Sequence, residues 1–220
     1  MVELFTSQGC STCPPADRLL AELARRDPAL VPLAFHVDYW NRLGWTDPFS
    51  QHAWSERQGA YARARGTSRV STPQAIVDGL VEITGAEEDR LGAAVAAEAK
   101  RPAADITLTL LRGPSEIRVA VDVSVPTQLR AHELDLMIAV FETDLVTPVN
   151  GGENGGSTLR DSYVVRSLVR AARIAAGGSG RSTHAASLPI SADWSRSHLG
   201  VAAFLQDPRS LEIAGARAER

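Results

Sequence analysis

Two cysteines near the start of the chain, Cys10 and Cys13, constrain this protein more than any other feature. They are separated by two residues and are the only cysteines among 220 residues. An apolar run with strand character, residues 2–6, precedes them, and a helical pattern follows from about residue 13 to residue 26. This order places a thiol at a helix N-terminus, where unpaired N–H groups favour a thiolate. A bridge across two residues closes too small a loop to stabilise such a fold, so the pair indicates thiol–disulfide chemistry.

The composition excludes several classes of partner. Lys and Arg number 23 against 26 Asp and Glu, and they form no basic stripe, so nucleic acid is not an expected partner. No apolar run approaches the length of a membrane span, so we expect no membrane partner either. Glu3 lies where a signal peptide would carry basic residues, which predicts a cytoplasmic protein. A mature periplasmic or secreted fragment with a start Met would look the same.

The first half of the chain follows the order of a compact α/β unit. Residues 31–39 predict a second strand, and so short a strand–helix–strand unit implies a parallel pair with a right-handed crossover. An aromatic loop, residues 40–50, leads into a second helix at about 48–65. A β-hairpin and a third helix, about 86–100, complete the order βαβαββα. We therefore predict one domain over residues 1–103.

The second half changes to β character. From Ile117 to Val125 apolar residues alternate with polar or small ones, which predicts a strand with one buried face. Residues 104–220 therefore predict an antiparallel β domain of the sandwich type, which makes the whole chain α+β. Further strands are expected near residues 105–112, 133–143, 159–173, 183–190, 200–206 and 210–214.

The two cysteines predict different roles. Cys10 lies at the first turn of the helix, so we expect a lowered pKa and a thiolate that attacks a disulfide. Cys13 lies one turn further in, and we expect it to be more deeply buried and to resolve the mixed disulfide. The redox-active pair is then the only reactive group required, and no separate cofactor is predicted.

Residues 3–17, ELFTSQGCSTCPPAD, resemble the opening of an uncharacterised bacterial family in the thioredoxin/glutaredoxin superfamily, a domain-of-unknown-function family. The resemblance covers nearly the whole chain. It implies a thioredoxin-like domain with a C-terminal β extension, and it brings no established activity. Many relatives carry secretion signals. The other matching segments are residues 36–40, 44–49, 72–74, 152–155 and 201–207.

The resemblance also implies a partner for the cysteines. Thioredoxin-like domains carry a proline after a cis peptide bond that faces the disulfide, and Thr72-Pro73 is at the matching place, before the third strand. We therefore place Pro73 with the catalytic cysteines and Thr72 in the substrate-binding site. The sequence departs from better-known relatives where Leu4 replaces a buried proton-accepting acid, and in the dipeptide Ser-Thr between the cysteines.

Three polar residues are candidates for a proton relay. Glu3 or Asp38 can take the place of the missing acid, and His36 shares a strand face with Asp38. The alternative is that His36 and Asp38 form a structural hydrogen-bonded pair. With two thiolates, His36 or His52 would also suit copper, but the chain lacks the four ligands at recognisable spacing that a closed zinc site requires, and we predict no metal.

Aromatic residues between the second strand and second helix are candidates for a substrate groove. Trp40 and Trp45 lie in this loop, where they either line a groove beside the thiols or pack the loop onto the core. The glycine-rich residues 151–158 lack the lysine and helix of a phosphate loop, and no serine nucleophile motif is present.

These observations predict a thiol–disulfide oxidoreductase that acts on protein or low-molecular-weight disulfides through Cys10 and Cys13. The alternative from another class is a binding protein. It would be either a copper carrier that uses both cysteines and a histidine, or a redox-inert adaptor on the same scaffold.

Overall fold

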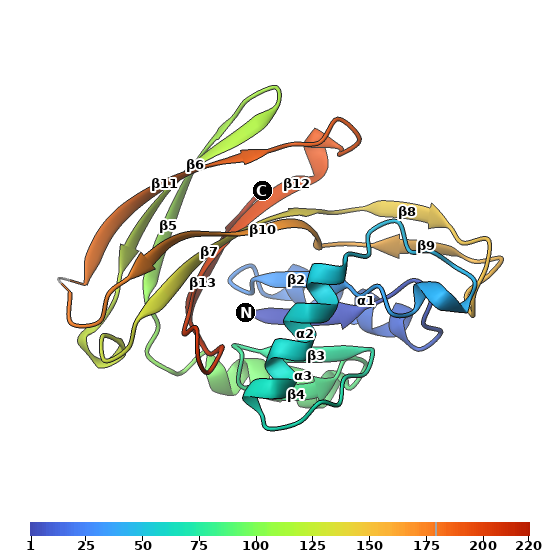
Figure 1. Ribbon diagram of the computed structural model, residues 1–220, viewed down its shortest axis with the longest axis horizontal. Coiled ribbons are helices and arrows are strands. Elements are labelled where there is room, and N and C mark those ends of the chain that lie inside the picture. Colours follow the sequence, from blue (N-terminus) through green and yellow to red (C-terminus); the bar gives the residue numbers. More distant parts are fainter. Residues whose placement is uncertain (179) are drawn as a thin grey trace. The chain divides into compact units, whose positions relative to one another are not determined.

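The computed structural model describes residues 1–178 and 180–220 and is α+β (Figure 1). In the described residues the helices are α1 (Cys13–Arg26), α2 (His52–Ala64) and α3 (Glu88–Glu98). The strands are β1 (Val2–Thr6), β2 (Pro32–His36), β3 (Gln74–Val77), β4 (Val81–Thr84), β5 (Asp105–Arg112), β6 (Glu116–Ser124), β7 (Leu134–Glu142), β8 (Leu145–Pro148), β9 (Thr158–Asp161), β10 (Val164–Ile174), β11 (Arg181–Pro189), β12 (Leu199–Gln206) and β13 (Ile213–Glu219). No helix in this part of the chain is long and apolar enough to cross a membrane.

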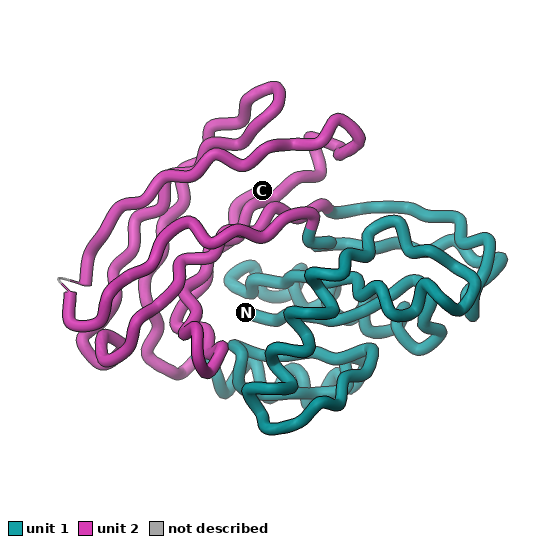
Figure 2. The backbone as a smooth tube through the Cα atoms, in the orientation of Figure 1, with its two compact units in different colours: residues 1–99, 143–165 teal, residues 100–142, 166–220 magenta. Residues whose placement is uncertain are grey.

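The chain divides into two compact units, coloured separately in Figure 2. Unit 1 combines residues 1–99 with residues 143–165, and unit 2 combines residues 100–142 with residues 166–220. The predicted division at residues 103 and 104 therefore differs from the compact units, because residues 143–165 pack with the first half of the chain. Sequence patterns identify strands but do not show which sheet a strand joins, so this return of the chain was not predictable.

Unit 1 is built on a mixed sheet in which β2, β1, β3 and β4 are neighbours in that order. β1 and β2 are parallel, as predicted, and β3 pairs with β1 antiparallel. Val164 at the start of β10 lies beside Ala34 of β2 and adds a further parallel neighbour. The first α-helix therefore crosses between two parallel strands and brings its N-terminus to their carboxyl ends.

Helices cover both faces of this sheet. Leu4 of β1 packs with Leu20 of α1 and Leu91 of α3 on one face. On the other face Phe5 meets Tyr61 of α2, with ring centroids 6.1 Å apart in an edge-on arrangement. Side chains of a strand alternate between faces, so the even-numbered residues of β1 face α1 and the odd-numbered ones face α2.

Helix α1 follows from its local sequence. Pro14 and Pro15 occupy its first turn, where a missing N–H group costs nothing, and Leu19 and Leu20 supply its buried stripe. Helix α2 begins at His52, four residues later than Pro48, where the sequence predicted it. Asp47 explains the difference, because its side chain accepts the Phe49 N–H and holds the preceding residues in a turn.

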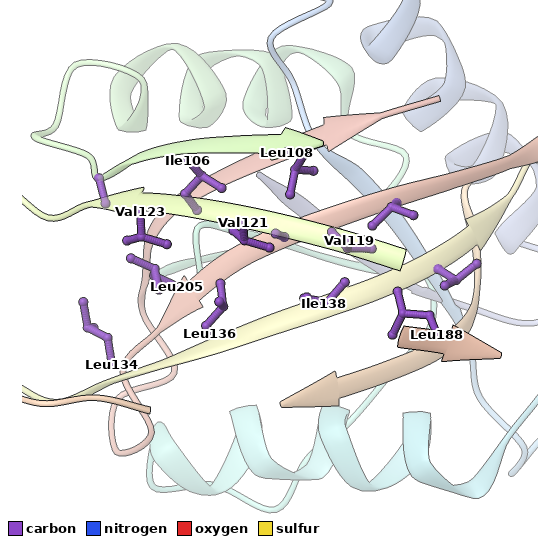
Figure 3. Close-up of a cluster of buried hydrophobic side chains, with 14 of the residues drawn as sticks. Ile106, Leu108, Val119, Val121, Val123, Leu134, Leu136, Ile138, Leu188 and Leu205 are labelled. Atoms are coloured by element: carbon purple, nitrogen blue, oxygen red, sulfur yellow. The ribbon is translucent and has the colours of Figure 1, made fainter. Parts of the chain in front are cut away.

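Unit 2 is antiparallel β structure, as predicted. One sheet has the order β11-β6-β5, and β12 pairs with both β7 and β13 in a second group of strands. The alternating residues of β6 point inward, and Val119, Val121 and Val123 are buried with Leu136 and Ile138 of β7 (Figure 3). The hydrophobic core of this unit therefore lies between its two groups of strands.

Two of the strands predicted in the second half of the chain need correction. Residues 159–173 are not one strand, because Ser162 and Tyr163 separate β9 from β10, and Tyr163 has a positive φ of 61°. The last strand is β13, which begins at Ile213 and not at Ser210. Strand β8 was not predicted, and it pairs with β9 in a hairpin within unit 1.

Candidate functional site

The Cys-Ser-Thr-Cys loop connects β1 to α1, and Cys13 is the first residue of the helix. The Cys10 N–H donates to the Ser7 carbonyl at 3.1 Å, and the Cys13 N–H donates to the Cys10 carbonyl at 3.2 Å. Both cysteines are free thiols. Their exposed fractions are 1 % for Cys10 and 0 % for Cys13, so both side chains are shielded from solvent and exposure alone does not distinguish them.

The pKa values of the two thiols, in contrast, are shifted in opposite directions. A hydrogen bond from the Cys13 thiol lowers the pKa of Cys10 to about 6, against the effect of burial and with help from Thr12 and Thr72. The Sγ of Cys10 lies 3.3 Å from the Thr12 hydroxyl oxygen. Burial raises the pKa of Cys13, and its hydrogen bond to Cys10 and the charge of Asp17 raise it further. Cys10 is therefore the thiol that ionises first.

Thr72 lies beside Cys10, and Trp40 is bonded to Thr72. The Thr72–Pro73 peptide bond is cis, as predicted, and the Cys10 thiol donates to the Thr72 carbonyl over 3.9 Å. The Trp40 indole Nε1 donates to the Thr72 hydroxyl at 2.8 Å. Trp40 thus holds Thr72 against the cysteine loop.

Trp45 contacts Gln8, two residues before Cys10, instead of Thr72. Its indole Nε1 donates to the Gln8 side-chain oxygen at 3.2 Å. Of the two predicted groove residues, Trp40 is therefore connected to the Cys10 neighbour Thr72, and Trp45 supports the turn that leads into the loop.

Two of the three predicted relay residues, Glu3 and Asp38, are hydrogen-bonded to side chains of helix α2. Glu3 is fully buried, and it accepts from Arg57 Nε at 2.6 Å and from the Tyr61 hydroxyl. Asp38 lies beyond the end of β2 and accepts from Ser55 at 2.5 Å. Burial alone would raise the pKa of Asp38, but hydrogen bonds from Ser55 and His52 lower it. The carboxylates of Glu3 and Asp38 are therefore both bonded to side chains of α2.

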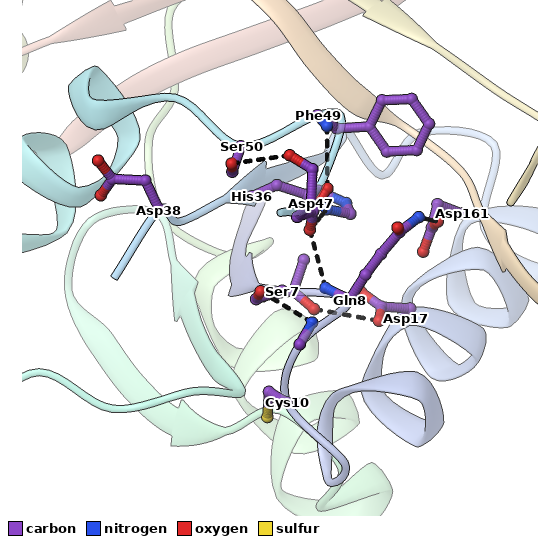
Figure 4. A network of polar contacts seen from close by, with 12 residues as sticks. Ser7, Gln8, Cys10, Asp17, His36, Asp38, Asp47, Phe49, Ser50 and Asp161 are labelled. Carbon is purple, nitrogen blue, oxygen red and sulfur yellow. Dashed lines mark hydrogen bonds and ion pairs between the residues drawn. The ribbon is translucent and has the colours of Figure 1, made fainter. Parts of the chain in front are cut away.

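His36 belongs to a separate buried cluster on the α1 face of the sheet (Figure 4). Its Nδ1 lies 2.7 Å from Asp47 Oδ2, and the same oxygen accepts the Gln8 N–H at 2.8 Å. Burial alone would lower the pKa of His36, but the Asp47 carboxylate raises it to about 9. His36 therefore pairs with Asp47, and the expected pair with Asp38 is wrong.

Asp161 extends the cluster from a distant part of the sequence. Its Oδ2 accepts from the Gln8 side-chain amide at 2.6 Å, across 153 positions of sequence. Burial raises the pKa of Asp161, and the positive charge of His36 opposes this effect. Gln8 thus connects the turn before Cys10 to two buried carboxylates, those of Asp47 and Asp161.

Asp17 is the functional candidate that sequence reasoning missed. It lies on α1 four residues after Cys13, on the same helix face, and its Oδ2 accepts the Thr6 hydroxyl at 3.0 Å. Its Oδ1 is buried without a hydrogen-bond partner. Burial, with the nearby charge of Asp161, raises the pKa of Asp17 to about 8. The spacing of four from Cys13 was the available signal, since it places an acid one helical turn below the thiol.

The loop of residues 151–156 between β8 and β9 contains a segment that matched the family resemblance, but its contacts were not predicted. The Asn154 side-chain amide donates to the carbonyls of Gln8 at 2.8 Å and Cys10 at 2.9 Å. The Glu153 carboxylate accepts from both the N–H and the hydroxyl of Ser11, at 2.9 and 2.7 Å. No local pattern marks these contacts, because each spans more than 140 positions of sequence.

The same side chains bear on the copper-binding alternative. Across residues 1–178 and 180–220, no group of three or more His, Cys, Asp or Glu side chains is arranged to hold a metal ion. His36 is bonded to Asp47, and His52 lies 3.0 Å from Asp38. The two histidines that could complete a copper site with the cysteines therefore have carboxylate partners.

Comparison with known proteins places the chain in a family. Residues 1–206 match the family model described as protein of unknown function, DUF1223. The chain belongs to this family. The solved structure of a protein of Agrobacterium tumefaciens is 31 % identical, with a TM-score of 0.77 over 99 % of this chain and 91 % of that one. No protein with a curated description matches.

A more distant structure shares the fold of this DUF1223 protein. It is HBP35 of Porphyromonas gingivalis, with 14 % identity and a TM-score of 0.72 over 99 % of this chain and 73 % of that one. At this identity the likeness concerns the fold alone.

Proposed function

We propose that this DUF1223 protein is a thiol–disulfide oxidoreductase in which unit 1 is a thioredoxin-like domain. The observation that carries the proposal is the unequal thiol pair at the N-terminus of α1, with the pKa of Cys10 lowered to about 6 and that of Cys13 raised. A thiol of low pKa is substantially ionised at neutral pH and attacks disulfides as the thiolate. The strand order of unit 1 and the position of Pro73 beside the loop support the domain assignment.

The reaction has two displacement steps. The Cys10 thiolate attacks one sulfur of a substrate disulfide, forms a mixed disulfide and releases the other half as a thiolate. Cys13 then loses its proton and attacks the Cys10 sulfur, which releases the second thiolate and leaves a Cys10–Cys13 disulfide. The substrate gains two electrons and the protein loses two, and the same steps in reverse oxidise a dithiol.

The second step requires a proton acceptor, because the raised pKa of Cys13 keeps this thiol protonated. Asp17 is the group we assign to it, since its Oδ1 is buried without a hydrogen-bond partner and lies on the same face of α1 as Cys13. With a pKa of about 8, Asp17 is a stronger base than an ordinary carboxylate, and it accepts the proton in the fraction of molecules in which it is ionised, which grows as the pH rises toward 8. This assignment replaces the earlier candidates Glu3 and Asp38, which bond to α2.

Substrate access is part of the proposed reaction. Cys10 is 1 % exposed, while the neighbouring Ser11 and Thr12 are exposed. A disulfide therefore reaches the sulfur only after the side chains around it move. We assign Thr72 and Trp40 to this access region, because Thr72 lies beside Cys10 and Trp40 is bonded to Thr72.

Two cysteine variants and an insulin-reduction assay test the proposal. We expect Cys10→Ser to abolish disulfide exchange, and Cys13→Ser to accumulate mixed disulfides with substrates, visible on non-reducing gels and absent after reduction. Ser11→Ala is the matched control, since it alters the same loop without removing a thiol. An inactive wild type that retains one copper ion through gel filtration would instead establish the binding-protein alternative.

A further inference from the structure

The loop of residues 151–156, which we call the Glu153 loop, delivers a carboxylate to the cysteine motif itself. Ser11 lies between the two cysteines, and both of its polar hydrogens are bonded to Oε2 of Glu153. Glu153 and Ser11 are both exposed. A negative charge therefore lies at the surface next to the position where a substrate disulfide must approach Cys10.

The position of this charge is held by further contacts. Asn154, the next residue, is bonded to the carbonyls of Gln8 and Cys10 and so ties the Glu153 loop to both ends of the turn. At the start of the loop, a Cβ at Gly151 would overlap the carbonyl oxygen of Gly44, so only glycine permits this close approach. The hydrogen bonds from Ser11 also lower the pKa of Glu153, which keeps it ionised at neutral pH.

We propose that Glu153 is a specificity-determining residue that favours disulfides with a positive charge beside the reacting sulfur and disfavours anionic ones. The inference rests on the proposed oxidoreductase function. Its physical basis is twofold. The N–H group of Ser11 at a helix start would otherwise attract an anionic group of a substrate, and the protein's own carboxylate occupies it. The same carboxylate attracts a cation and repels an anion at short range.

Three small disulfides of different charge test the inference directly. Cystamine carries two positive charges, dithiodipropionate two negative charges and hydroxyethyl disulfide none. The second-order rate constants for oxidation of the reduced protein are measured with each by stopped-flow tryptophan fluorescence. Expressing each rate relative to that of the neutral disulfide removes any general change in the reactivity of Cys10, so the ratios report charge preference alone.

We expect the wild type to react faster with cystamine than with dithiodipropionate after this normalisation. Glu153→Gln preserves the shape and an acceptor oxygen for Ser11 but removes the charge. Its cystamine-to-dithiodipropionate ratio should fall about three- to tenfold, as expected for a unit charge at a few ångströms from solvated groups. Added salt should reduce the wild-type preference and leave the variant unchanged.

Two further variants complete the design. Glu153→Lys should reverse the preference, and Glu22→Gln, which removes an exposed carboxylate more than two turns along α1, should leave it at the wild-type value. An unchanged ratio in Glu153→Gln and Glu153→Lys, in protein that still exchanges all three disulfides, overturns the inference and leaves the oxidoreductase function standing. A wild type that reacts with none of the three overturns the function itself.

A pair of peptide disulfides identifies the source of the charge. One peptide carries lysine beside each cysteine, the other carries glutamate there, and the two sequences are otherwise identical. A preference for the lysine peptide that is lost in Glu153→Gln assigns basic protein segments as substrates. A preference confined to cystamine assigns small amine disulfides.

Discussion

Cys13 acts on Cys10 before any substrate is present, because the Cys13 thiol supplies the largest effect that lowers the pKa of Cys10. The asymmetry of the pair therefore depends on both residues, and in the proposed reaction the resolving cysteine also activates the attacking one.

Removing the Cys13 thiol should accordingly raise the pKa of Cys10 from about 6 toward the ordinary thiol value. We expect Cys13→Ala to shift the pH midpoint of thiolate absorbance near 240 nm upward by at least one unit. Thr12→Ala should give a smaller shift in the same direction, since the hydrogen bond with Thr12 lowers the pKa of Cys10 less than the one from Cys13 does. An unchanged midpoint in Cys13→Ala would show that other groups hold the thiolate.

Asp17 provides a kinetic prediction at the same scale. Asp17→Asn keeps the size of the side chain and removes its basicity, so proton transfer from Cys13 should slow by about 10²- to 10⁴-fold. Mixed disulfide should then accumulate during turnover, while the first displacement by Cys10 proceeds. Quenched-flow alkylation followed by mass spectrometry measures both steps. Equal slowing of both steps would assign Asp17 a structural role.

Asp17 also predicts how stability depends on pH. Its folded pKa of about 8 lies above the ordinary value of 3.8, so the folded state keeps a proton that the unfolded state has lost. Stability from this group is therefore present at low pH and is lost as pH rises from about 4 through 8, by at most about 1.4 kcal/mol per pH unit. Urea unfolding at about pH 5 and pH 7.5 should show a smaller loss in Asp17→Asn than in the wild type.

At the scale of elements, strand β1 carries polar side chains on both of its faces, and each face contacts a different helix. Thr6 faces α1 and meets Asp17, whereas Glu3 faces α2 and meets Arg57 and Tyr61. The alternation of a strand places the Glu3–Arg57 ion pair and the Asp17 carboxylate on opposite faces of the sheet, and only Asp17 belongs to the proposed reaction.

The Glu3–Arg57 pair should therefore matter for stability and not for exchange. Glu3 is fully buried and the Arg57 side chain is 11 % exposed, so Glu3→Ala leaves a buried charge without its partner. We expect a loss of about 3–5 kcal/mol in the free energy of unfolding. The exposed Glu22–Arg26 pair is the control, and Glu22→Ala should change stability by less than about 1 kcal/mol. A similar loss in both variants, measured by urea denaturation, would contradict this account.

At the scale of the whole molecule, unit 1 is assembled from two separated stretches of chain. The second stretch, residues 143–165, supplies the Glu153 loop, Asp161 and a backbone neighbour for β2, where the Ala34 N–H donates to the Tyr163 carbonyl at 2.8 Å. The cysteine loop therefore lacks part of its surroundings until residues 143–165 pack with residues 1–99.

A fragment of residues 1–103 should consequently be much less stable than unit 1 in the intact chain. It lacks the buried side chains of Tyr163, Val164 and Val165, each worth about 1.5–3 kcal/mol, against a total near 5–15 kcal/mol. Circular dichroism with urea should show a weak, uncooperative transition. The same fragment joined to residues 143–165 through a flexible linker should regain a cooperative unfolding transition. Equal stability of the two fragments would contradict the prediction.

Much of the fold was predictable because its signals are local. The alternation from Ile117 to Val125 predicted the buried face of β6, and the paired prolines predicted the first turn of α1. The site was predictable only in part. The cysteines and Pro73 carry a recognisable spacing and context, but the partners of Glu3, His36 and Asp38 depend on which helix packs on which face, and a strand pattern does not specify that.

The amino-acid sequence by itself determined the family, the α+β class and a thiol pair at the start of a helix, because motifs, periodicity and spacing along the chain carry each of them. Only the tertiary structure decided what surrounds that pair. It brought Asp161 to Gln8 and Glu153 to Ser11 across 153 and 142 positions. Contacts of this kind arise from the packing of distant segments, and they leave no periodicity or spacing in a single sequence.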